Sequence, residues 1–447
     1  MKRLFGTDGI RAKAGEFPLD EKTVNVIGAS LARFFREKLG REPRFVSGRD
    51  TRESGSWIEA AFHSGAVSEE AACESAGIIT TPGVAYVTNA FDFDAGIVVS
   101  ASHNPYEDNG VKIFLPSGKK VGGDVERAIE QDIRDDTLVG SDVIELRSNR
   151  AADFKDSYLE HLRQQADGLS LAGKSIVIDC ANGAASDLAP DLFSSLGANV
   201  IAINNSPDGR NINENCGSLH LENLQAKVIK ESADLGVAFD GDADRALFVD
   251  EKGEVVDGDA TIWVMAQYLK EHGKLANSTV VTTVMSNIGL ELALKAKGIN
   301  LLRTDVGDKY VLEKLIETGS RIGGEQSGHI IFPEISLVGD GMVTALLLLK
   351  AVTKKDASLS EAVEGFVRYP QILVNVKVKE KRPFDDVPEI VEASQRCEDE
   401  LHGEGRLLLR YSGTENLARV MIEGREQDQI VTQANRLAAV IQSTLGQ

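Results

Sequence analysis

Three aspartates occupy alternate positions in FDGDADR, the segment at residues 239–245. Asp240, Asp242 and Asp244 can bring three carboxylates close together, and crowded carboxylates repel one another unless a cation is bound among them. A helix-flanked calcium loop fits poorly, because Arg245 stands where that loop needs glycine and strand-like runs lie on both sides. Mg²⁺ commonly shares its coordination positions with phosphate oxygens, so the segment favours Mg²⁺ and a phosphorylated partner over an exposed acidic turn.

The loop SASHNPYEDNGVK, residues 100–112, follows the apolar run GIVV and contains a second candidate. Ser102 could carry a phosphoryl group, because a metal ion held by the aspartates would offset the added negative charge. A serine hydrolase that pairs Ser102 with His103 is disfavoured, since we expect adjacent side chains not to face one another and find no G-x-S-x-G segment. A turn without chemistry is the remaining alternative for this loop.

Two further segments have the residue types of a phosphosugar site. RYSGTENLAR combines guanidinium groups, hydroxyls and a glycine with exposed amides, which predicts a phosphate cradle or, alternatively, a polar hairpin turn; its candidates are Arg410, Ser412, Gly413, Thr414 and Arg419. GGEQSGH places Glu325, Ser327 and His329 at alternate positions, where they could bind vicinal sugar hydroxyls or belong to a structural bulge. The isolated arginine of FGTDGIR, Arg11, indicates little by itself.

A nucleotide-binding P-loop is suggested by GLSLAGKS, residues 168–175, which matches G-x-x-x-x-G-K-S. A P-loop follows a strand and opens a helix, so that its amides point at phosphate. Here a helical pattern comes before the segment and a strand pattern comes after it. The sequence therefore predicts a turn into a strand rather than a nucleotide site.

The composition limits the class of protein. The chain has 447 residues with 69 acidic and 49 basic side chains, a net charge of −20, which disfavours non-specific binding to nucleic acid or anionic membrane. The four cysteines are scattered, and neither a zinc site nor a disulfide framework is indicated. We find no signal-peptide pattern, and the apolar run at 342–352 is too short to span a bilayer, so we expect a cytoplasmic protein.

These segments share one pattern along the chain: an apolar run, a cluster of Gly, Ser, Asn or Asp, and then a helix-period stretch. This pattern is typical of α/β domains, whose functional loops lie at strand ends, and its recurrence predicts three similar units. Near residue 369 the pattern changes to one-sided strands, such as QILVNVKVK, and amphipathic helices. We predict α/β domains at 1–154, 155–255 and 256–368 and a small α+β domain at 369–447.

Taken in order, TDGIR, SGRDTR, SASHNP, FDGDADR, GGEQSGH and RYSGTEN resemble the motifs of the α-D-phosphohexomutase superfamily over essentially the whole chain. Gln326 and Asp308 resemble its phosphoglucosamine mutase branch, because the phosphomannomutase/phosphoglucomutase branch typically has Met and His there. VMSNIGLE, residues 284–291, also resembles the first branch. Ala12, where the family usually has Gly, and Leu219, where it usually has Thr, depart from the pattern; a positive φ at Ala12 would shift the backbone.

The resemblance implies four domains around a central cleft, with three α/β/α units and a fourth domain like the TATA-binding-protein fold. It implies that phosphorylated Ser102 donates to glucosamine 6-phosphate, that the resulting glucosamine 1,6-bisphosphate turns around, and that glucosamine 1-phosphate is released toward UDP-N-acetylglucosamine synthesis. The fourth domain, hinged near residues 368–370, is our candidate lid. A mutase acting on glucose or mannose phosphates, a metal-dependent phosphatase and a non-catalytic sugar-phosphate sensor are the alternatives.

By motif match, the resemblance also assigns roles. Mg²⁺ is held by the Ser102 phosphate with Asp240, Asp242 and Asp244. The non-reacting phosphate is bound by Arg410, Ser412 and Thr414, with Gly413 and Arg419 beside them. Sugar hydroxyls are bound by Glu325 and Ser327. Charge stabilisation and proton transfer fall to Arg11, His103, Lys112, Arg245 and His329, among which the general base stays open, as does the question of a homodimer.

Overall fold

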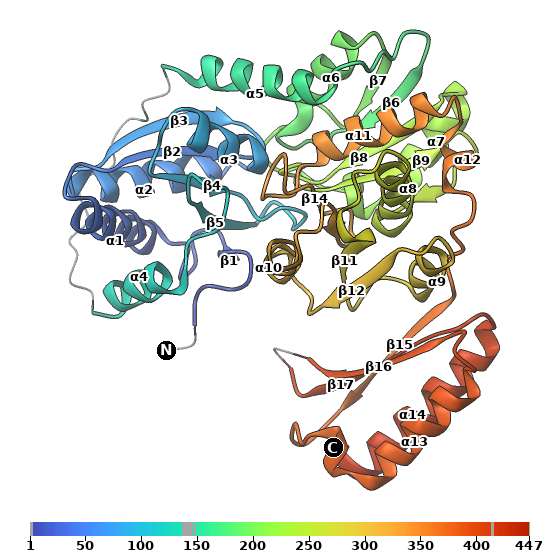
Figure 1. The fold of residues 1–447 in the computed structure, drawn as a ribbon. Coiled ribbons are helices and arrows are strands. Elements are labelled where there is room, and N and C mark those ends of the chain that lie inside the picture. The colour runs from blue at the N-terminus through green and yellow to red at the C-terminus, as the bar shows by residue number, and fades with distance from the viewer. Residues whose placement is uncertain (1–2, 136–145, 147–148, 413–414, 447) are drawn as a thin grey trace. The chain divides into compact units, whose positions relative to one another are not determined.

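The computed structural model describes residues 3–135, 146, 149–412 and 415–446, and the chain divides into two compact units (Figure 1). Unit 1 comprises Met1–Thr283 and Thr304–Val363, and unit 2 comprises Val284–Arg303 and Glu364–Gln447. The individual domain boundaries predicted from the sequence stay predictions. No helix among the described residues is long and apolar enough to cross a membrane.

Unit 1 begins with a five-stranded mixed sheet. Its strands, in spatial order, are β1 (Ile10–Lys13), β5 (Asp108–Phe114), β4 (Ala95–Val99), β2 (Arg44–Arg49) and β3 (Ala72–Ile78). The β2 strand is parallel to both β3 and β4, whereas β5 is antiparallel to β4 and β1. The accompanying helices are α1 (Glu21–Leu39), α2 (Gly55–Ser68), α3 (Thr81–Ala90), α4 (Gly123–Asp135) and α5 (Ala151–Gln165). Apolar side chains of α1, α2 and the sheet form one core cluster.

A second five-stranded sheet follows. Its spatial order is β10 (Val255–Val256), β9 (Ala246–Asp250), β8 (Leu235–Phe239), β6 (Ser175–Asp179) and β7 (Asn199–Ile203). Its helical elements are α6 (Ala185–Ser195), η1 (Gly217–Leu219) and α7 (Glu222–Glu231). The order β9-β8-β6-β7 repeats the order β5-β4-β2-β3 of the first sheet, with the same antiparallel first strand. The expectation of similar α/β units is thereby confirmed.

A third set of elements completes unit 1. Its strands β14 (Ile330–Ile331), β13 (Gly323–Gly324) and β11 (Thr279–Thr283) repeat the first three places of the same order. Its helical elements are α8 (Gly258–Glu271), η2 (Ala276–Ser278), α10 (Asp308–Thr318), α11 (Gly341–Lys354) and α12 (Leu359–Val363). The apolar run at 342–352 lies in α11, a largely buried helix.

Unit 2 contains a three-stranded antiparallel sheet, as predicted for a small α+β domain. Its order is β15 (Gln371–Lys377), β17 (Leu417–Glu423) and β16 (Arg406–Tyr411). The remaining elements are α9 (Ile288–Ala296), most of β12 (Asn300–Thr304), η3 (Phe384–Asp386), α13 (Pro388–Glu400) and α14 (Gln427–Leu445). The alternating apolar residues of β15 pack into the core of this unit with α14, which confirms the one-sided strand.

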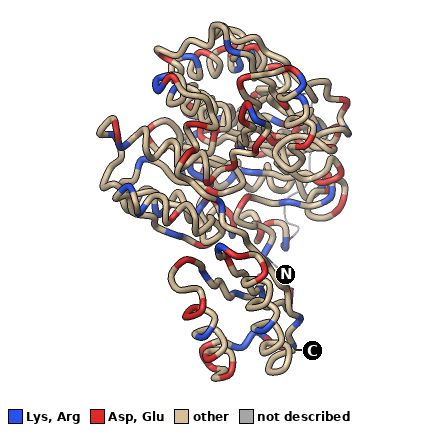
Figure 2. The backbone as a smooth tube through the Cα atoms, turned by 90° about the vertical axis from the view of Figure 1, so that its right-hand side faces the viewer, with Lys and Arg blue, Asp and Glu red and all other residues tan. Residues whose placement is uncertain are grey.

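Several local expectations are also confirmed. FDGDADR joins the strands β8 and β9 rather than two helices, and GLSLAGKS follows helix α5 and leads into strand β6. Ala12 lies in β1 opposite Asn109 and does not have positive φ, so its departure from the family pattern does not shift the strand. Leu219, the other departure from the family pattern, has 54% of its surface exposed to solvent. Figure 2 shows acidic and basic residues interspersed along the described backbone.

Two glycines let α1 and α2 pack with their backbones in close contact. A Cβ atom on Gly28 would lie 2.1 Å from the Phe62 carbonyl oxygen, and one on Gly65 would lie 1.8 Å from the Asn25 carbonyl oxygen. Neither helix can accept a methyl group there without moving away, because the opposing atoms are backbone.

We therefore expect Gly28→Ala and Gly65→Ala each to lower the free energy of unfolding by about 1–3 kcal/mol, the usual cost of overpacking. Urea denaturation followed by circular dichroism measures this difference. Glu37→Ala, an exposed position on the same helix α1, is the control and should change stability by less than about 0.5 kcal/mol. Glycine variants as stable as this control would contradict the close contact.

Candidate active site

Three carboxylates meet in the loop between β8 and β9. Asp240, Asp242 and Asp244 are all buried, and one oxygen of each lies within 4.8 Å of the others. Asp242 Oδ2 accepts a hydrogen bond from Thr81 Oγ1 at 2.5 Å. Asp242 Oδ1 and Asp244 Oδ1 are buried without a hydrogen-bond partner among the described residues. Carboxylate oxygens that accept no hydrogen bond suit a hard cation, so these residues fit Mg²⁺.

Burial and the close approach of charged groups shift the pKa values of Asp240 and Asp244. Burial, Asp244 and Asp242 raise the pKa of Asp240 well above its ordinary value. Burial also favours the protonated form of Asp244, but Lys112, His329 and Arg245 hold its pKa well below the usual range. The cluster therefore keeps its negative charge only where cations lie close to it.

Lys112, on β5, supplies the nearest cation. Its Nζ lies 2.8 Å from Asp242 Oδ2, 3.5 Å from Asp244 Oδ2 and 3.4 Å from Asp8 Oδ2. Burial alone would lower the pKa of Lys112, but these carboxylates raise it above its ordinary value. A buried ammonium in this position offsets the repulsion between Asp242 and Asp244.

Ser102 lies just after β4, and the fold brings it against the aspartates. Its Oγ donates a hydrogen bond to Asp240 Oδ2 at 2.6 Å, across 138 positions of sequence, and the residue has φ of 54°, in the left-handed region. The expectation that Ser102 and His103 cannot face one another is wrong, because His103 Nδ1 lies 3.3 Å from Ser102 Oγ. Burial, Arg245 and Arg11 lower the pKa of His103 to about 4.

His329 approaches the cluster from the loop between β13 and β14. Its Nδ1 lies 3.5 Å from Asp244 Oδ1, and its Nε2 lies 3.9 Å from Asp308 Oδ2. Burial would lower the pKa of His329, but Asp244 and Asp308 raise it to about 9. Arg245 Nε lies 3.8 Å from Asp244 Oδ1. Positive charge thus surrounds the aspartates from several elements.

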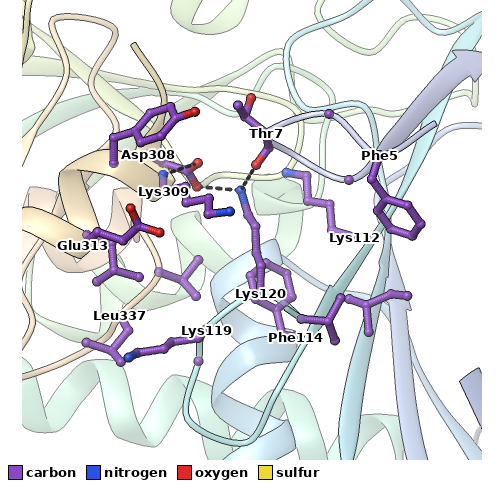
Figure 3. Close-up of a pocket in the computed structure, with 18 of the residues that line it drawn as sticks. Phe5, Thr7, Lys112, Phe114, Lys119, Lys120, Asp308, Lys309, Glu313 and Leu337 are labelled. Atoms are coloured by element: carbon purple, nitrogen blue, oxygen red, sulfur yellow. Dashed lines mark hydrogen bonds and ion pairs between the residues drawn. The ribbon is translucent and has the colours of Figure 1, made fainter. Parts of the chain in front are cut away.

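Two members of this network were not found by the sequence reasoning. Asp8 pairs with Arg11 and accepts a hydrogen bond from Lys120 Nζ at 2.6 Å, and Lys120 also binds Asp308 Oδ2 at 2.7 Å. Figure 3 shows Lys120 between Thr7 and Asp308. These three residues help to line a pocket of about 400 Å³. Asp8 lies in the motif TDGIR and could have been noted there, whereas no spacing pattern marks Lys120.

The sugar-recognition candidates lie in the same unit. Glu325 is half-buried, and its Oε1 accepts a hydrogen bond from the Gly307 backbone amide at 3.2 Å. Ser327 Oγ donates to Glu325 Oε2 at 3.3 Å. Glu325 is one of the carboxylates that raise the pKa of His329 and Arg245, so this loop lies beside the aspartate cluster.

The phosphate-cradle candidates lie in unit 2. Arg410 on β16 and Arg419 on β17 are directly opposite one another in the antiparallel register, so both side chains lie on the same face of the sheet. Arg419 Nε has no hydrogen-bond partner among the described residues. Ser412 follows β16, whereas Gly413 and Thr414 lie outside the described residues. Like charges placed opposite one another are destabilising unless an anion lies between them.

Comparison with known proteins gives matches along the whole chain. The phosphoglucomutase/phosphomannomutase family models match as α/β/α domain I at 2–139, domain II at 156–253, domain III at 257–369 and the C-terminal domain at 373–440. A curated relative from Solibacter usitatus named phosphoglucosamine mutase is 48% identical over 448 residues and 100% of both chains.

Solved structures share the fold. A phosphoglucomutase/phosphomannomutase family protein from Burkholderia thailandensis has a TM-score of 0.80 at 24% identity, covering 99% of this chain and 98% of that one. The Aspergillus fumigatus N-acetylphosphoglucosamine mutase in complex with GlcNAc-6P and magnesium has a TM-score of 0.68 at 19% identity, covering 98% and 95%. The four-domain α/β architecture predicted from the sequence is thereby confirmed.

The position of Lys112 makes a prediction about metal binding. Because its ammonium competes with a bound cation for Asp242 and Asp244, Lys112→Met should lower the thermal midpoint of the metal-free protein and increase the upward shift on adding Mg²⁺. Differential scanning calorimetry with and without Mg²⁺ measures both. Lys120→Met is the matched control, since Lys120 contacts Asp8 and Asp308 instead of the triad. Equal Mg²⁺ shifts in both variants would contradict the competition.

Proposed function

Because the chain belongs to the phosphoglucomutase/phosphomannomutase family, in its phosphoglucosamine mutase branch, we propose that it interconverts glucosamine 6-phosphate and glucosamine 1-phosphate through phosphorylated Ser102. The observation that carries this proposal is the 2.6 Å hydrogen bond between Ser102 Oγ and Asp240 inside a buried cluster of three carboxylates. A plain serine gains little from such surroundings, whereas a phosphoserine can share a metal ion with the carboxylates.

The proposed metal is Mg²⁺, and Asp240, Asp242 and Asp244 with the Ser102 phosphate would hold it. When bound, Mg²⁺ neutralises phosphate oxygens and so assists phosphoryl transfer. The magnesium in the Aspergillus fumigatus complex supports this choice. We further propose glucosamine 1,6-bisphosphate as the intermediate, with Ser102 giving its phosphoryl group to one end of the sugar and recovering one from the other.

In this proposal, the cationic side chains around Ser102 stabilise the negative charge of the phosphoryl group during its transfer. Lys112, Arg245 and His329 bring positive charge to the place where the phosphoryl group passes, and Lys112 and His329 are almost fully enclosed, so water screens their charges weakly. Arg11 is held near Lys112 through their shared partner Asp8. We assign these four residues to charge stabilisation and proton transfer, with His103 beside the carrier, and leave the general base unassigned.

In this proposal, substrate binding is assigned to two further groups of residues, one for the sugar hydroxyls and one for the non-reacting phosphate. Glu325 and Ser327 bind sugar hydroxyls, which stay in reach in either orientation of the ring. Arg410, Ser412, Gly413, Thr414 and Arg419 bind the phosphate that is not reacting. The opposed pair Arg410 and Arg419 supports this role, because a phosphate dianion would offset their mutual repulsion. We propose a cytoplasmic enzyme and leave a homodimer as a further proposal.

Ser102→Ala removes the phosphoryl carrier, so turnover of glucosamine 6-phosphate should fall by at least about 10⁴-fold, as for loss of other catalytic nucleophiles. A coupled assay measures turnover, and intact mass spectrometry measures phosphate on the protein. Ser68→Ala, on helix α2, is the control and should keep full activity. Near-normal turnover in Ser102→Ala would refute the carrier. Stoichiometric release of free phosphate would favour a phosphatase instead.

The substrate preference separates the proposal from its alternative, a mutase for glucose or mannose phosphates. A site that binds the amino group should disfavour an analogue with a hydroxyl there, because its own polar groups are left badly paired. We expect kcat/KM for glucosamine 6-phosphate to exceed that for glucose 6-phosphate and mannose 6-phosphate by at least about tenfold. Steady-state kinetics with the three substrates under identical conditions measure the ratios. Equal values would favour the alternative.

A further inference from the structure

The carbonyl oxygen of Ser102 is enclosed by side-chain donors from two parts of unit 1. Arg52 Nη2 donates to it at 3.2 Å, and Asn213 Nδ2 donates at 2.9 Å. The same two groups also donate to the Asn104 carbonyl, at 2.5 Å and 3.0 Å respectively. Gly241 closes the remaining side, because a Cβ atom there would lie 2.6 Å from the Ser102 carbonyl oxygen.

Arg52 is a hydrogen-bond donor here rather than a free cation. It is 1% exposed, and its other Nη atom pairs with Asp50, which is fully buried. The charge of this guanidinium is therefore already balanced, and its two contacts with the Ser102 loop are both to backbone carbonyls. Such a residue is suited to holding a loop in place rather than to binding substrate phosphate.

The conformation that these donors hold is one that serine rarely adopts. Ser102 has φ of 54°, in the left-handed region that disfavours residues with a Cβ atom. Within the turn itself, the Ser102 backbone amide donates a hydrogen bond to Ser100 Oγ at 2.9 Å. Uncommon backbone conformations persist at functional sites when surrounding contacts determine them, and Arg52 and Asn213 provide such contacts.

We propose that Arg52 and Asn213 are positioning residues that clamp the Ser102 carbonyl and thereby direct the Ser102 Oγ atom toward the aspartate cluster. One donor comes from the first sheet region and the other from the second, so the carrier is aligned only where these two regions meet. The inference rests on the proposed role of Ser102 as phosphoryl carrier. Both residues contact this loop at backbone carbonyls, so their effect on Ser102 passes through the backbone.

Asn213→Gly is the principal test, because Asn213 has φ of 58° and glycine accepts that backbone while removing the donor. Arg52→Lys keeps the charge beside Asp50 but removes the planar fork. We expect each variant to lower kcat by about 10- to 100-fold with KM within about twofold, the effect of misplacing a reacting group by a fraction of a side chain. Single-turnover transfer from phosphorylated Ser102 should slow by the same factor.

Thr51→Val is the matched control. Thr51 Oγ1 donates to the Asn182 carbonyl at 2.6 Å, so this variant removes a buried hydrogen bond between the same two regions without touching Ser102. Its kcat should stay within about twofold of wild type, even where its thermal midpoint falls as far as that of Asn213→Gly. The double variant Arg52→Lys/Asn213→Gly should lose less than the product of the single losses, because both donors serve one carbonyl.

Two results would overturn the clamp. One is an Asn213→Gly protein with the kcat of Thr51→Val, and the other is a Thr51→Val protein that loses kcat as severely as Asn213→Gly. Failure of the proposed function gives a different result, since the wild-type protein would then carry no phosphate on Ser102 and show no turnover. Asn213→Gly leaves the buried pair of Arg52 and Asp50 intact, so it decides the question even where Arg52→Lys does not fold.

Discussion

The structure depends on compensating three carboxylates that are buried in one loop. Removing carboxylates from water costs several kcal/mol each in real proteins, and their mutual repulsion adds to that cost. Asp240, Asp242 and Asp244 persist because cationic side chains from other elements converge on them, chiefly Lys112 and His329. The fold must therefore bring a β5 residue, the β8–β9 loop and the β13–β14 loop to one place.

The repeated strand order explains how these loops are brought together. The strands β4, β8 and β13 take the same place in their three sheets, each next to an antiparallel strand that follows it in the chain. The loop after each of them holds a functional group: Ser102 after β4, the aspartates after β8 and His329 after β13. One sheet topology used three times thus brings Ser102, the three aspartates and His329 to equivalent strand ends.

This regularity is why much of the site could be predicted from the sequence. An apolar run followed by small polar residues marks each functional strand end, and alternating aspartates are a local pattern that survives without any knowledge of contacts. Lys120 and Asn213 could not be found in this way. Each is a single polar residue without characteristic spacing, and Asn213 reaches Ser102 across 111 positions of sequence.

The contact between Ser102 and His103 shows a second limit of prediction from sequence. The expectation that adjacent side chains point apart assumes an extended backbone. The residue types near Ser102 do not indicate that this serine has a left-handed backbone conformation. The conformation comes instead from donors that are distant in sequence, which determine the turn after the chain has folded.

The arrangement of charged side chains also differs between the two units. A chain with a net charge of −20 repels a sugar phosphate at long range, so capture depends on cations concentrated at particular places. Unit 1 uses its cations largely to balance its own carboxylates, as the ion pairs of Lys112 and Lys120 show. Unit 2, in contrast, sets Arg410 opposite Arg419 in one sheet. Two guanidinium groups on one face of a sheet repel one another less when an anion lies between them, which is why the proposed function puts the non-reacting phosphate at this pair.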